Sequence, residues 1–359
     1  MSKSPIHIIG AFGYITGHLD GQTMESRSLR TLLEMHGIND YTYFDTEQLH
    51  FNKMSFFKMF GGLFKTERLF YLGAQANLKY IFPFLWLIAK LRGIEFHYFV
   101  VGGWIAEYLK NKPMHRWMLR RINGMYCEIW SISNKLTKFY GYKHVDCFPN
   151  FRIYSFKPEI KFYDGEPLRL VYMARIVASK GYKRVFDLAE YIQQKYGDDK
   201  VVIDFYGPIF PDDKEPFFEG VARFGFVKYK GVLQPEVINE TLAGYDAMLF
   251  PTNYPGEGLP GTIVDSYISG IPVIASDWRY NAELIEHGKT GFVFDLNKPS
   301  QFYEAVELIM NDRNLLFQMK QQAHAKRVDF DYTTAWNVIE RHVGIKARKE
   351  SKGVVETVR

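Results

Sequence analysis

Short apolar runs alternate with helical stretches over the first 155 residues of the chain. The run IHIIGAFG at residues 6–13 is typical of a buried strand that leads into a glycine-rich loop, and ESRSLRTLLEMHG at residues 25–37 has the apolar spacing of a helix that ends at a glycine. The runs EFHYFVVGG at residues 95–103 and EIWSIS at residues 128–133 are predicted to be further strands. Because strands that alternate with helices favour a parallel sheet, we expect a Rossmann-like domain here.

A second series of apolar runs fills the remainder of the chain. Five runs share the pattern of a short buried strand: LRLVYMARI, VVIDFYG, AMLFPT, IPVIAS and TGFVFD, which begin at residues 168, 201, 247, 271 and 290. The segment 148–167 contains three prolines and is expected to link the two series. We therefore predict an α/β protein with domains at residues 1–158 and 159–330. A C-terminal helix over 331–345 is expected to pack back toward the first domain, before a polar tail over 346–359.

Length and composition agree with two folded domains. A chain of 359 residues is too long for one typical core, and 47% hydrophobic with 24% charged residues is typical of a folded protein. The longest apolar run, which starts at Tyr80, is shorter than the roughly 20 residues of a spanning helix, so no membrane-spanning segment is expected. Cys127 and Cys147 are too few for a disulfide framework or a zinc site, and we expect a cytoplasmic protein.

Charge is distributed unevenly between the two halves. Residues 1–155 carry 19 lysine and arginine residues against 11 acidic ones, whereas the remaining residues carry 26 against 29. A basic half beside a slightly acidic one predicts that the first half faces something anionic, such as a membrane surface or a phosphorylated lipid.

A loop rich in glycine and proline is the most informative stretch of the second half. Its sequence over residues 251–265 is PTNYPGEGLPGTIVD, and it leads into a predicted helix, whose first amides can hold a phosphate. Glu257 precedes this helix and Asp265 follows eight residues later, so one carboxylate can lie at the mouth of a site while the other accepts hydrogen bonds from sugar or ribose hydroxyls. An ordinary strand-loop-helix turn explains the glycines alone, but the two acids favour a binding site.

Two cations follow the first strand of the second domain. Arg175 ends the run LRLVYMARI, and Lys180 comes five residues later, directly before Gly181 and a predicted helix. Cations above the carboxyl ends of parallel strands suit a diphosphate, because they can neutralise the charge that develops on a leaving nucleotide. A solvated surface pair is the alternative for either residue alone, and only the combination with the acidic loop favours a site.

Together these motifs resemble those of the retaining glycosyltransferases of family 4. RIVASKG at residues 175–181 is similar to the Arg-x4-Lys-Gly element of that family, and EGLPGTIVD at residues 257–265 is similar to its Glu-x7-Glu element. The resemblance is close over the second domain and looser over the first, where it includes DGQTMESRSLRTLLEMHG and FPNF. It implies a GT-B fold, in which two Rossmann-like domains face each other across a cleft.

The resemblance also assigns roles to individual residues. Arg175 and Lys180 would hold the donor diphosphate and act in catalysis with Glu257, which would bind the donor sugar, and Asp265 would bind the ribose. Gly21 would let the backbone approach the phosphate or the sugar. The remaining implied donor contacts lie in the acidic loop and in the region that seats the nucleotide base: Gly258, Leu259, Pro260, Gly261, Tyr229 and Val232.

The chain departs from the family pattern at two places. Asp265 replaces the second glutamate, so ribose binding requires the backbone to lie closer. Many relatives carry a histidine in the loop after a central strand of the first domain, whereas this chain has Gly102, Gly103 and Trp104 there. No catalytic histidine is therefore carried over, and His97 at the start of that strand is interpreted as a packing or surface residue. Trp104 could stack on an acceptor or donor sugar, although a packing role is equally compatible with its position.

The resemblance implies an enzyme of the EC 2.4 class. It would move a sugar from a UDP- or GDP-linked donor to a glycan or a polyprenyl-diphosphate-linked acceptor, with retention of configuration and without a metal ion or another cofactor. The family context is bacterial capsule, exopolysaccharide or O-antigen assembly. Two alternatives stay open: a nucleotide-sugar epimerase of GT-B fold, and a non-catalytic sugar-nucleotide-binding or membrane-docking subunit. Nucleic-acid binding is disfavoured, because no recognition motif accompanies the basic charge.

Aromatic and basic residues are interleaved in two segments of the first domain, residues 51–70 and 112–121. At helical spacing they could place apolar side chains on lipid and cations on phosphates, which would make the protein peripheral on the inner face of the cell membrane. The alternative is a core-facing aromatic stripe with a solvated basic face. The candidate membrane-facing residues are Phe56, Phe57, Phe60, Phe64, Arg116, Trp117, Met118, Arg120 and Arg121, with Lys53, Lys58 and Lys65.

Overall fold

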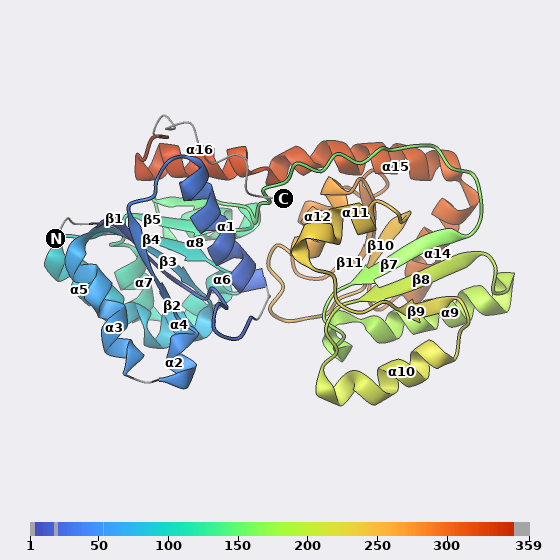
Figure 1. The fold of residues 1–359 in the computed structure, drawn as a ribbon, viewed down its shortest axis with the longest axis horizontal. Coiled ribbons are helices and arrows are strands. Elements are labelled where there is room, and N and C mark those ends of the chain that lie inside the picture. Colours follow the sequence, from blue (N-terminus) through green and yellow to red (C-terminus); the bar gives the residue numbers. More distant parts are fainter. Residues whose placement is uncertain (1–3, 18–20, 53, 348–359) are drawn as a thin grey trace. The chain divides into compact units, whose positions relative to one another are not determined.

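The computed structural model describes residues 4–17, 21–52 and 54–347 (Figure 1). It divides into two compact units: unit 1 comprises residues 1–153 and 330–359, and unit 2 comprises residues 154–329. Nearly all of the predicted polar tail lies outside the described residues, as does Lys53. Within the described ranges, no helix is long and apolar enough to cross a membrane.

Unit 1 is built on a parallel sheet with the strand order β2-β1-β3-β4-β5-β6. Its strands are β1 (Ser4–Gly10), β2 (Tyr41–Asp45), β3 (Thr66–Gly73), β4 (Glu95–Val100), β5 (Gly124–Cys127) and β6 (Val145–Cys147). Successive side chains of β3 point to opposite faces of the sheet. Phe70 and Leu72 pack in the cluster that includes the leucines of the first helix, whereas Tyr71 contacts Phe82 on the other face.

Helices cover both faces of this sheet. They are α1 (Gly21–Met35), α2 (Gln48–Phe51), α3 (Ser55–Gly61), η1 (Gly62–Lys65), α4 (Gln75–Tyr80), α5 (Phe82–Arg92), α6 (Ile105–Tyr108), η2 (Leu109–Asn111), α7 (Pro113–Leu119) and α8 (Trp130–Tyr140). The prediction of a strand at EIWSIS was wrong, because the strand ends at Cys127 and α8 begins at Trp130. Ile132, Ser133 and Leu136 are the buried residues of α8, and their spacing of one, three and four is that of a helix face.

The chain returns to unit 1 at its C-terminal end. Helix α16 (Tyr332–Val343) buries Ala335, Trp336, Ile339 and Val343 in one cluster with residues of β1 and α1. The indole ring of Trp336 stacks on His36 of unit 1 at 3.6 Å between ring centroids. The core of unit 1 is therefore made from both ends of the sequence.

Unit 2 carries a second parallel sheet, with the order β12-β11-β10-β7-β8-β9. Its strands are β7 (Leu168–Met173), β8 (Val201–Tyr206), β9 (Val227–Tyr229), β10 (Ala247–Phe250), β11 (Val273–Ser276) and β12 (Gly291–Phe294). Five of them coincide with the runs of the second predicted series. The sequence did not predict β9, which has only three residues.

The helices of unit 2 flank this sheet and supply much of its core. They are η3 (Ala178–Lys180), α9 (Tyr182–Tyr196), η4 (Pro211–Asp213), α10 (Lys214–Ala222), η5 (Pro235–Val237), α11 (Ile238–Leu242), α12 (Gly261–Ile268), α13 (Asn281–Leu284), α14 (Pro299–Asn311) and α15 (Arg313–Lys326), followed by η6 (Arg327–Phe330). The chain enters β7, adds β8 on one side and later β10 on the other. The strand order therefore reverses between β7 and β10, and such switch points are where open α/β sheets bind ligands.

Candidate active site

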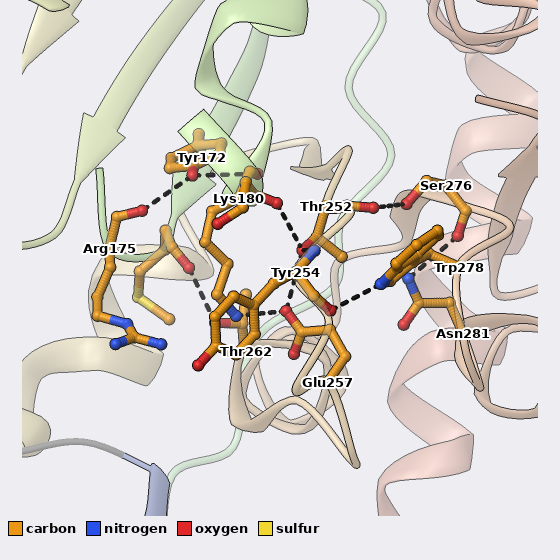
Figure 2. Close-up of polar contacts among 12 residues, drawn as sticks. Tyr172, Arg175, Lys180, Thr252, Tyr254, Glu257, Thr262, Ser276, Trp278 and Asn281 are labelled. Carbon is orange, nitrogen blue, oxygen red and sulfur yellow. Dashed lines mark hydrogen bonds and ion pairs between the residues drawn. The ribbon is translucent and has the colours of Figure 1, made fainter. Parts of the chain in front are cut away.

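The two motifs of unit 2 meet at this switch point. Arg175 and Lys180 follow β7, and the acidic loop from Pro251 to Pro260 follows β10, the neighbouring strand. Both segments leave the carboxyl ends of parallel strands, so the fold brings them to the same edge of the sheet (Figure 2).

Gly181 makes the close approach of the two segments possible. Its φ of +83° is a left-handed conformation, and a Cβ atom at this position would lie 2.0 Å from the carbonyl oxygen of Pro251. Next to this contact, the amide of Asn253 donates a hydrogen bond of 2.8 Å to the carbonyl of Ser179. The glycine that follows Lys180 is therefore required by packing. Any larger residue would separate the loop after β7, which carries Arg175 and Lys180 and is called the cationic loop, from the acidic loop.

Lys180 and Glu257 form a buried ion pair. Their side chains are only 12% and 6% exposed. The Thr252 hydroxyl donates a second hydrogen bond of 3.0 Å to the same carboxylate oxygen, Oε1 of Glu257. The ion pair and the hydrogen bond fix the orientation of this carboxylate. The sequence predicted that both residues would contact the donor, but it did not predict that they bind each other.

The Tyr254 ring lies against both cations. Its centroid is 4.8 Å from Nζ of Lys180 and 5.2 Å from the guanidinium carbon of Arg175, within the range of cation–π attraction. The Tyr254 amide donates to the Thr252 hydroxyl at 3.1 Å, and the Trp278 indole donates to the Tyr254 carbonyl at 2.7 Å. These bonds hold the backbone of Tyr254, and its ring contacts both cations.

A buried tyrosine supports the cationic loop from below. The Tyr172 hydroxyl on β7 lies 3.2 Å from the carbonyl oxygens of both Arg175 and Lys180. Burial, together with the nearby carboxylate of Glu257, raises the pKa of Tyr172 well above its usual value. The hydroxyl therefore keeps its proton and donates to the loop throughout the physiological range.

Helix α12 is fixed to the same strand. The Thr262 hydroxyl in its first turn donates a 2.8 Å hydrogen bond to the carbonyl of Met173, the last residue of β7. This bond places the amide end of α12 close to where Arg175 leaves the sheet, and the first amides of a helix have no acceptor within the helix. Asp265 lies one turn further along α12 and is buried, with 6% of its surface exposed. Gly258, Leu259 and Pro260 lead into the helix and are also buried.

Strand β11 supports the acidic loop from the other side. The Ser276 hydroxyl donates to the carbonyl of Thr252, and the Asn281 side-chain amide donates to the carbonyl of Ser276 at 3.0 Å. Sequence pattern alone did not indicate Thr252, Tyr254, Ser276 and Asn281. A signal was present for Thr252 and Tyr254, since polar residues directly after a buried strand lie at the carboxyl edge of the sheet.

The predicted base-binding residues lie on the other side of β8. The Tyr229 hydroxyl at the end of β9 donates a 3.0 Å hydrogen bond to the carbonyl of Gly207, which follows β8. Val232 is 55% exposed in the next loop. In the strand order both residues are separated from β7 by β8, so this part of the predicted site is displaced from the ion pair along the same edge.

The residues predicted in unit 1 lie at the start of a helix, in a loop and in the core. Gly21 is the first residue of α1, and a Cβ atom there would meet no atom within 4 Å. In the loop after β4, the Gly102 amide donates to Glu128 at 2.7 Å and the Trp104 indole donates to the carbonyl of Val101 at 2.7 Å. His97 is 2% exposed inside β4, and burial lowers its pKa to about 4. It is a core histidine, in agreement with the packing interpretation.

One pair of aspartates in the chain is separated by a single residue, an arrangement that can hold a divalent cation. Asp331 caps helix α16 by accepting a 2.8 Å hydrogen bond from the Thr333 amide, and Asp329 lies 3.6 Å from Lys326. Both carboxylates therefore have structural partners. In the described part of the chain, no group of three or more histidine, cysteine or acidic residues is arranged to hold a metal ion.

Comparison with known families identifies unit 2. Residues 155–326 match the family described as glycosyl transferases group 1, and this range covers almost the whole unit. Unit 2 is a glycosyl transferases group 1 domain. The two motifs that meet at the switch point therefore belong to this domain, and its family is described as glycosyl transferases.

Two curated proteins are similar to part of this chain. Alpha-D-kanosaminyltransferase of Streptomyces kanamyceticus is 26% identical over 160 residues, which are 45% of this chain and 40% of that protein. The amylovoran biosynthesis glycosyltransferase AmsK of Erwinia amylovora is 29% identical over 132 residues, 36% of this chain and 32% of that protein. The matched part of the chain therefore spans less than half the length of either relative.

Solved structures are similar over nearly the whole chain. Anabaena HepE, solved in complex with UDP-glucose, superposes with a TM-score of 0.68 at 16% identity and covers 95% of this chain and all of its own. Sucrose-phosphate synthase from Thermosynechococcus elongatus gives a TM-score of 0.71 at 13% identity, with 95% of this chain and 99% of its own covered. Identities this low establish the fold alone. The chain containing the group 1 domain has the GT-B fold, and this expectation from the sequence is confirmed.

Proposed function

We propose that the chain is a glycosyltransferase that moves a sugar from a UDP- or GDP-linked donor to a glycan or lipid-linked acceptor. The observation that carries this proposal is the cluster of Arg175, Lys180 and Glu257 at the switch point of a group 1 domain. Names of relatives support the same reaction class, since both curated proteins are named as transferases of sugars. HepE, whose fold is similar, was solved with UDP-glucose.

The donor diphosphate would bind between the two cations and the amide end of α12. Lys180 and Arg175 each bring a positive charge to this edge, and the first-turn amides of α12 point the same way as the helix dipole. As the bond from the sugar to the diphosphate breaks, negative charge grows on the leaving phosphate. Preorganised cations stabilise that charge more in the transition state than in the ground state, which is the condition for catalysis.

Glu257 would have two tasks in this scheme. It holds the Lys180 ammonium at a fixed place before the donor arrives, and its second oxygen can accept a hydrogen bond from a hydroxyl of the donor sugar. Asp265 would accept hydrogen bonds from the ribose. Because its side chain is one methylene shorter than glutamate, the ribose would have to lie closer to the backbone of α12. Gly21 and the loop at Gly102, Gly103 and Trp104 would serve the sugar and acceptor side.

The finer features of the proposal follow the resemblance to family 4. Transfer would proceed with retention at the anomeric carbon, and it would need no metal ion because Arg175 and Lys180 neutralise the leaving group. The acceptor would belong to capsule, exopolysaccharide or O-antigen assembly, a context supported by the amylovoran biosynthesis relative. A polyprenyl-diphosphate-linked acceptor would place the enzyme on the inner face of the cell membrane.

Nucleotide binding tests this proposal directly. A ligand that binds only the native state raises its melting temperature, so we expect UDP or GDP, but not both equally, to stabilise the purified chain in a thermal-shift assay. Arg175→Ala should abolish the shift and lower turnover by ~10²-fold or more. Arg223→Ala is the matched control, because Arg223 also lies in unit 2 but forms an exposed ion pair with Glu190. Loss of the shift in the control, or its retention in Arg175→Ala, would contradict the proposed site.

A further inference from the structure

Helix α5 of unit 1 is apolar on two opposite sides. Its inner side buries Phe82, Leu85 and Ala89. Its outer side exposes Phe84 by 52%, Leu87 by 50% and Leu91 by 77%, at a spacing of three and four residues. A soluble helix normally carries polar residues on its outer face, and one that is apolar all round is covered on all sides. The outer side of α5 therefore lacks the polar residues of a face made for water.

Neighbouring elements extend this apolar surface. The rings of Phe84 in α5 and Phe56 in α3 lie 5.7 Å apart between centroids, and those of Trp86 in α5 and Trp117 in α7 lie 5.0 Å apart. Arg92 at the end of α5 lies over the ring of Phe64 in η1 at 5.2 Å. The four elements α3, η1, α5 and α7 thus form one continuous face. We call it the aromatic face, and its exposed apolar residues are Phe57, Phe64, Phe84, Leu87, Leu91, Met114 and Trp117.

Part of the sequence prediction for this region needs correction. Met118 is 4% exposed and points into the core, so it cannot contact lipid. Phe56 and Phe60 are half-buried and support the face from beneath through an edge contact of 4.8 Å. Arg116 is half-buried beside the Tyr140 ring. Helix α5, which supplies the centre of the face, was not among the predicted membrane-facing segments.

Positive charge is concentrated around the aromatic face. Residues 51–121 carry twelve lysine and arginine residues but only three acidic ones, so they account for all of the excess positive charge in the first half of the chain. Two of the three acids already have basic partners: Glu95 pairs with Arg68, and Glu107 lies near Lys110. The exposed cations of the four elements are Lys58, Lys65, Lys90 and Arg92, and the exposed Arg120 and Arg121 directly follow α7.

Several of these cations lie close to the aromatic rings. The Arg121 guanidinium covers the Trp117 ring at 4.3 Å and donates a hydrogen bond to the Trp117 carbonyl. Arg92 donates in the same way to the carbonyl of Phe64. Within the described residues, no ion pair joins Arg92 or Arg121 to an acid. Apolar tips flanked by cations suit the boundary between acyl chains and phosphates, where the rings enter the apolar layer and the cations meet the headgroups.

We propose that the aromatic face docks unit 1 on a bilayer that contains anionic phospholipid. The charge complementarity selects this occupant: a second copy would bring the same exposed cations against one another, whereas an anionic membrane surface attracts each of them by about 1 kcal/mol. The largest apolar side chains of the face reach outward from short helices, so the contact is interfacial. This proposal rests on unit 1 alone and does not depend on the proposed sugar transfer.

Vesicle sedimentation with the full chain tests the docking. We expect binding to vesicles that mix phosphatidylglycerol with phosphatidylcholine, a marked loss of binding in 0.5 M salt, and little binding to phosphatidylcholine alone. The double variant Leu87→Asp with Leu91→Asp should weaken binding at least ~10-fold, because it removes apolar contacts and adds repulsion. Equal binding to both vesicle types, or unchanged binding of the double variant, would overturn the proposal.

Matched variants separate membrane docking from self-association and from misfolding. Leu308→Asp makes the same exchange at a residue of unit 2 that is also 50% exposed, and it should bind vesicles like the parent chain. Lys90→Gln should weaken binding about fivefold without altering the apolar area. The double variant should keep its melting temperature and its response to nucleotide, which shows that unit 2 is intact. If light scattering instead finds a dimer that the double variant abolishes, the face covers a second copy and the proposal fails.

Discussion

Lys180 and Glu257 lie 77 residues apart in the sequence, yet their side chains form a buried ion pair at the centre of the candidate site. The pair joins the loop after β7 to the loop after β10. Removal of one partner would leave the other charge buried without compensation, which typically costs about 3 kcal/mol or more. The pair is therefore both a binding element and a part of the framework of unit 2.

These two roles can be separated by mutation. We expect Lys180→Ala to lower the stability of unit 2 by about 3 kcal/mol and to abolish turnover. The double variant Lys180→Met with Glu257→Leu replaces the pair with apolar groups, so it should recover most of the stability while it stays inactive. Urea unfolding and a turnover assay measure the two effects. An active double variant would refute the catalytic assignment, and a fully stable Lys180→Ala would refute the buried pair.

The close approach at Gly181 can be tested against a glycine of similar backbone conformation. Gly181→Ala must place a methyl group 2.0 Å from the Pro251 carbonyl oxygen, and we expect displacement of the cationic loop with loss of nucleotide binding. Gly141→Ala is the control, because Gly141 is also left-handed, with φ of +65°, but has open space around it. It should cost only the 1–2 kcal/mol or so of backbone strain. Equal effects of both substitutions on nucleotide binding would show that the contact with Pro251 is unimportant.

Chelation tests how the leaving group is stabilised. If Arg175 and Lys180 neutralise the diphosphate, turnover should be the same in EDTA as in buffer with magnesium. Arg175→Lys keeps one charge but loses the planar fork of donors, so it should retain more activity than Arg175→Ala. Activity that is abolished by EDTA and restored by magnesium would contradict the metal-independent mechanism and redirect attention to acidic residues near α12.

The buried histidines of unit 1 predict acid sensitivity. Burial lowers the pKa values of His7 and His97 to about 4, whereas an unfolded histidine titrates near 6.5. Between these values the unfolded chain binds more protons, so stability is complete above pH 6.5 and falls as the pH drops toward 4. Each histidine should cost about 2 kcal/mol between pH 7 and pH 5.

A neutral replacement provides the control for this pH effect. His97→Gln should show a smaller loss of unfolding free energy between pH 7 and pH 5 than the parent chain, whatever its stability at pH 7. Urea unfolding at both pH values gives the comparison. An unchanged loss in the variant would mean that His97 is accessible to protons in the folded state.

The sequence predicted the fold largely because its strands are short, apolar and separated by helical segments. It also indicated Arg175, Lys180, Glu257 and Asp265, since their spacing relative to predicted strands and helices places them at one edge of a sheet. It misplaced the strand at residues 128–133, because apolar residues at the start of an amphipathic helix resemble a short buried strand. Periodicity over six residues cannot separate the two.

Contacts between distant segments were beyond the reach of local pattern. The positions of Thr252 and Tyr254 depend on the pairing of β7 with β10, and the role of Tyr254 depends on two cations from another loop. The exposed side of α5 was missed for a related reason. An apolar helix is expected to be buried, and only the packing of unit 1 shows which of its sides is covered.

The position of α16 affects how the protein folds during synthesis. Unit 1 needs Trp336 and Ile339 to complete its core, yet these residues are translated after the whole of unit 2. At a synthesis rate of roughly 5–20 residues per second, the surfaces of β1 and α1 that α16 covers stay uncovered for on the order of ten seconds or more. During this interval the nascent chain carries an incomplete apolar core. Unit 2, whose strands and helices are contiguous in sequence, can fold first, although the sheet of unit 1 leaves the ribosome before it.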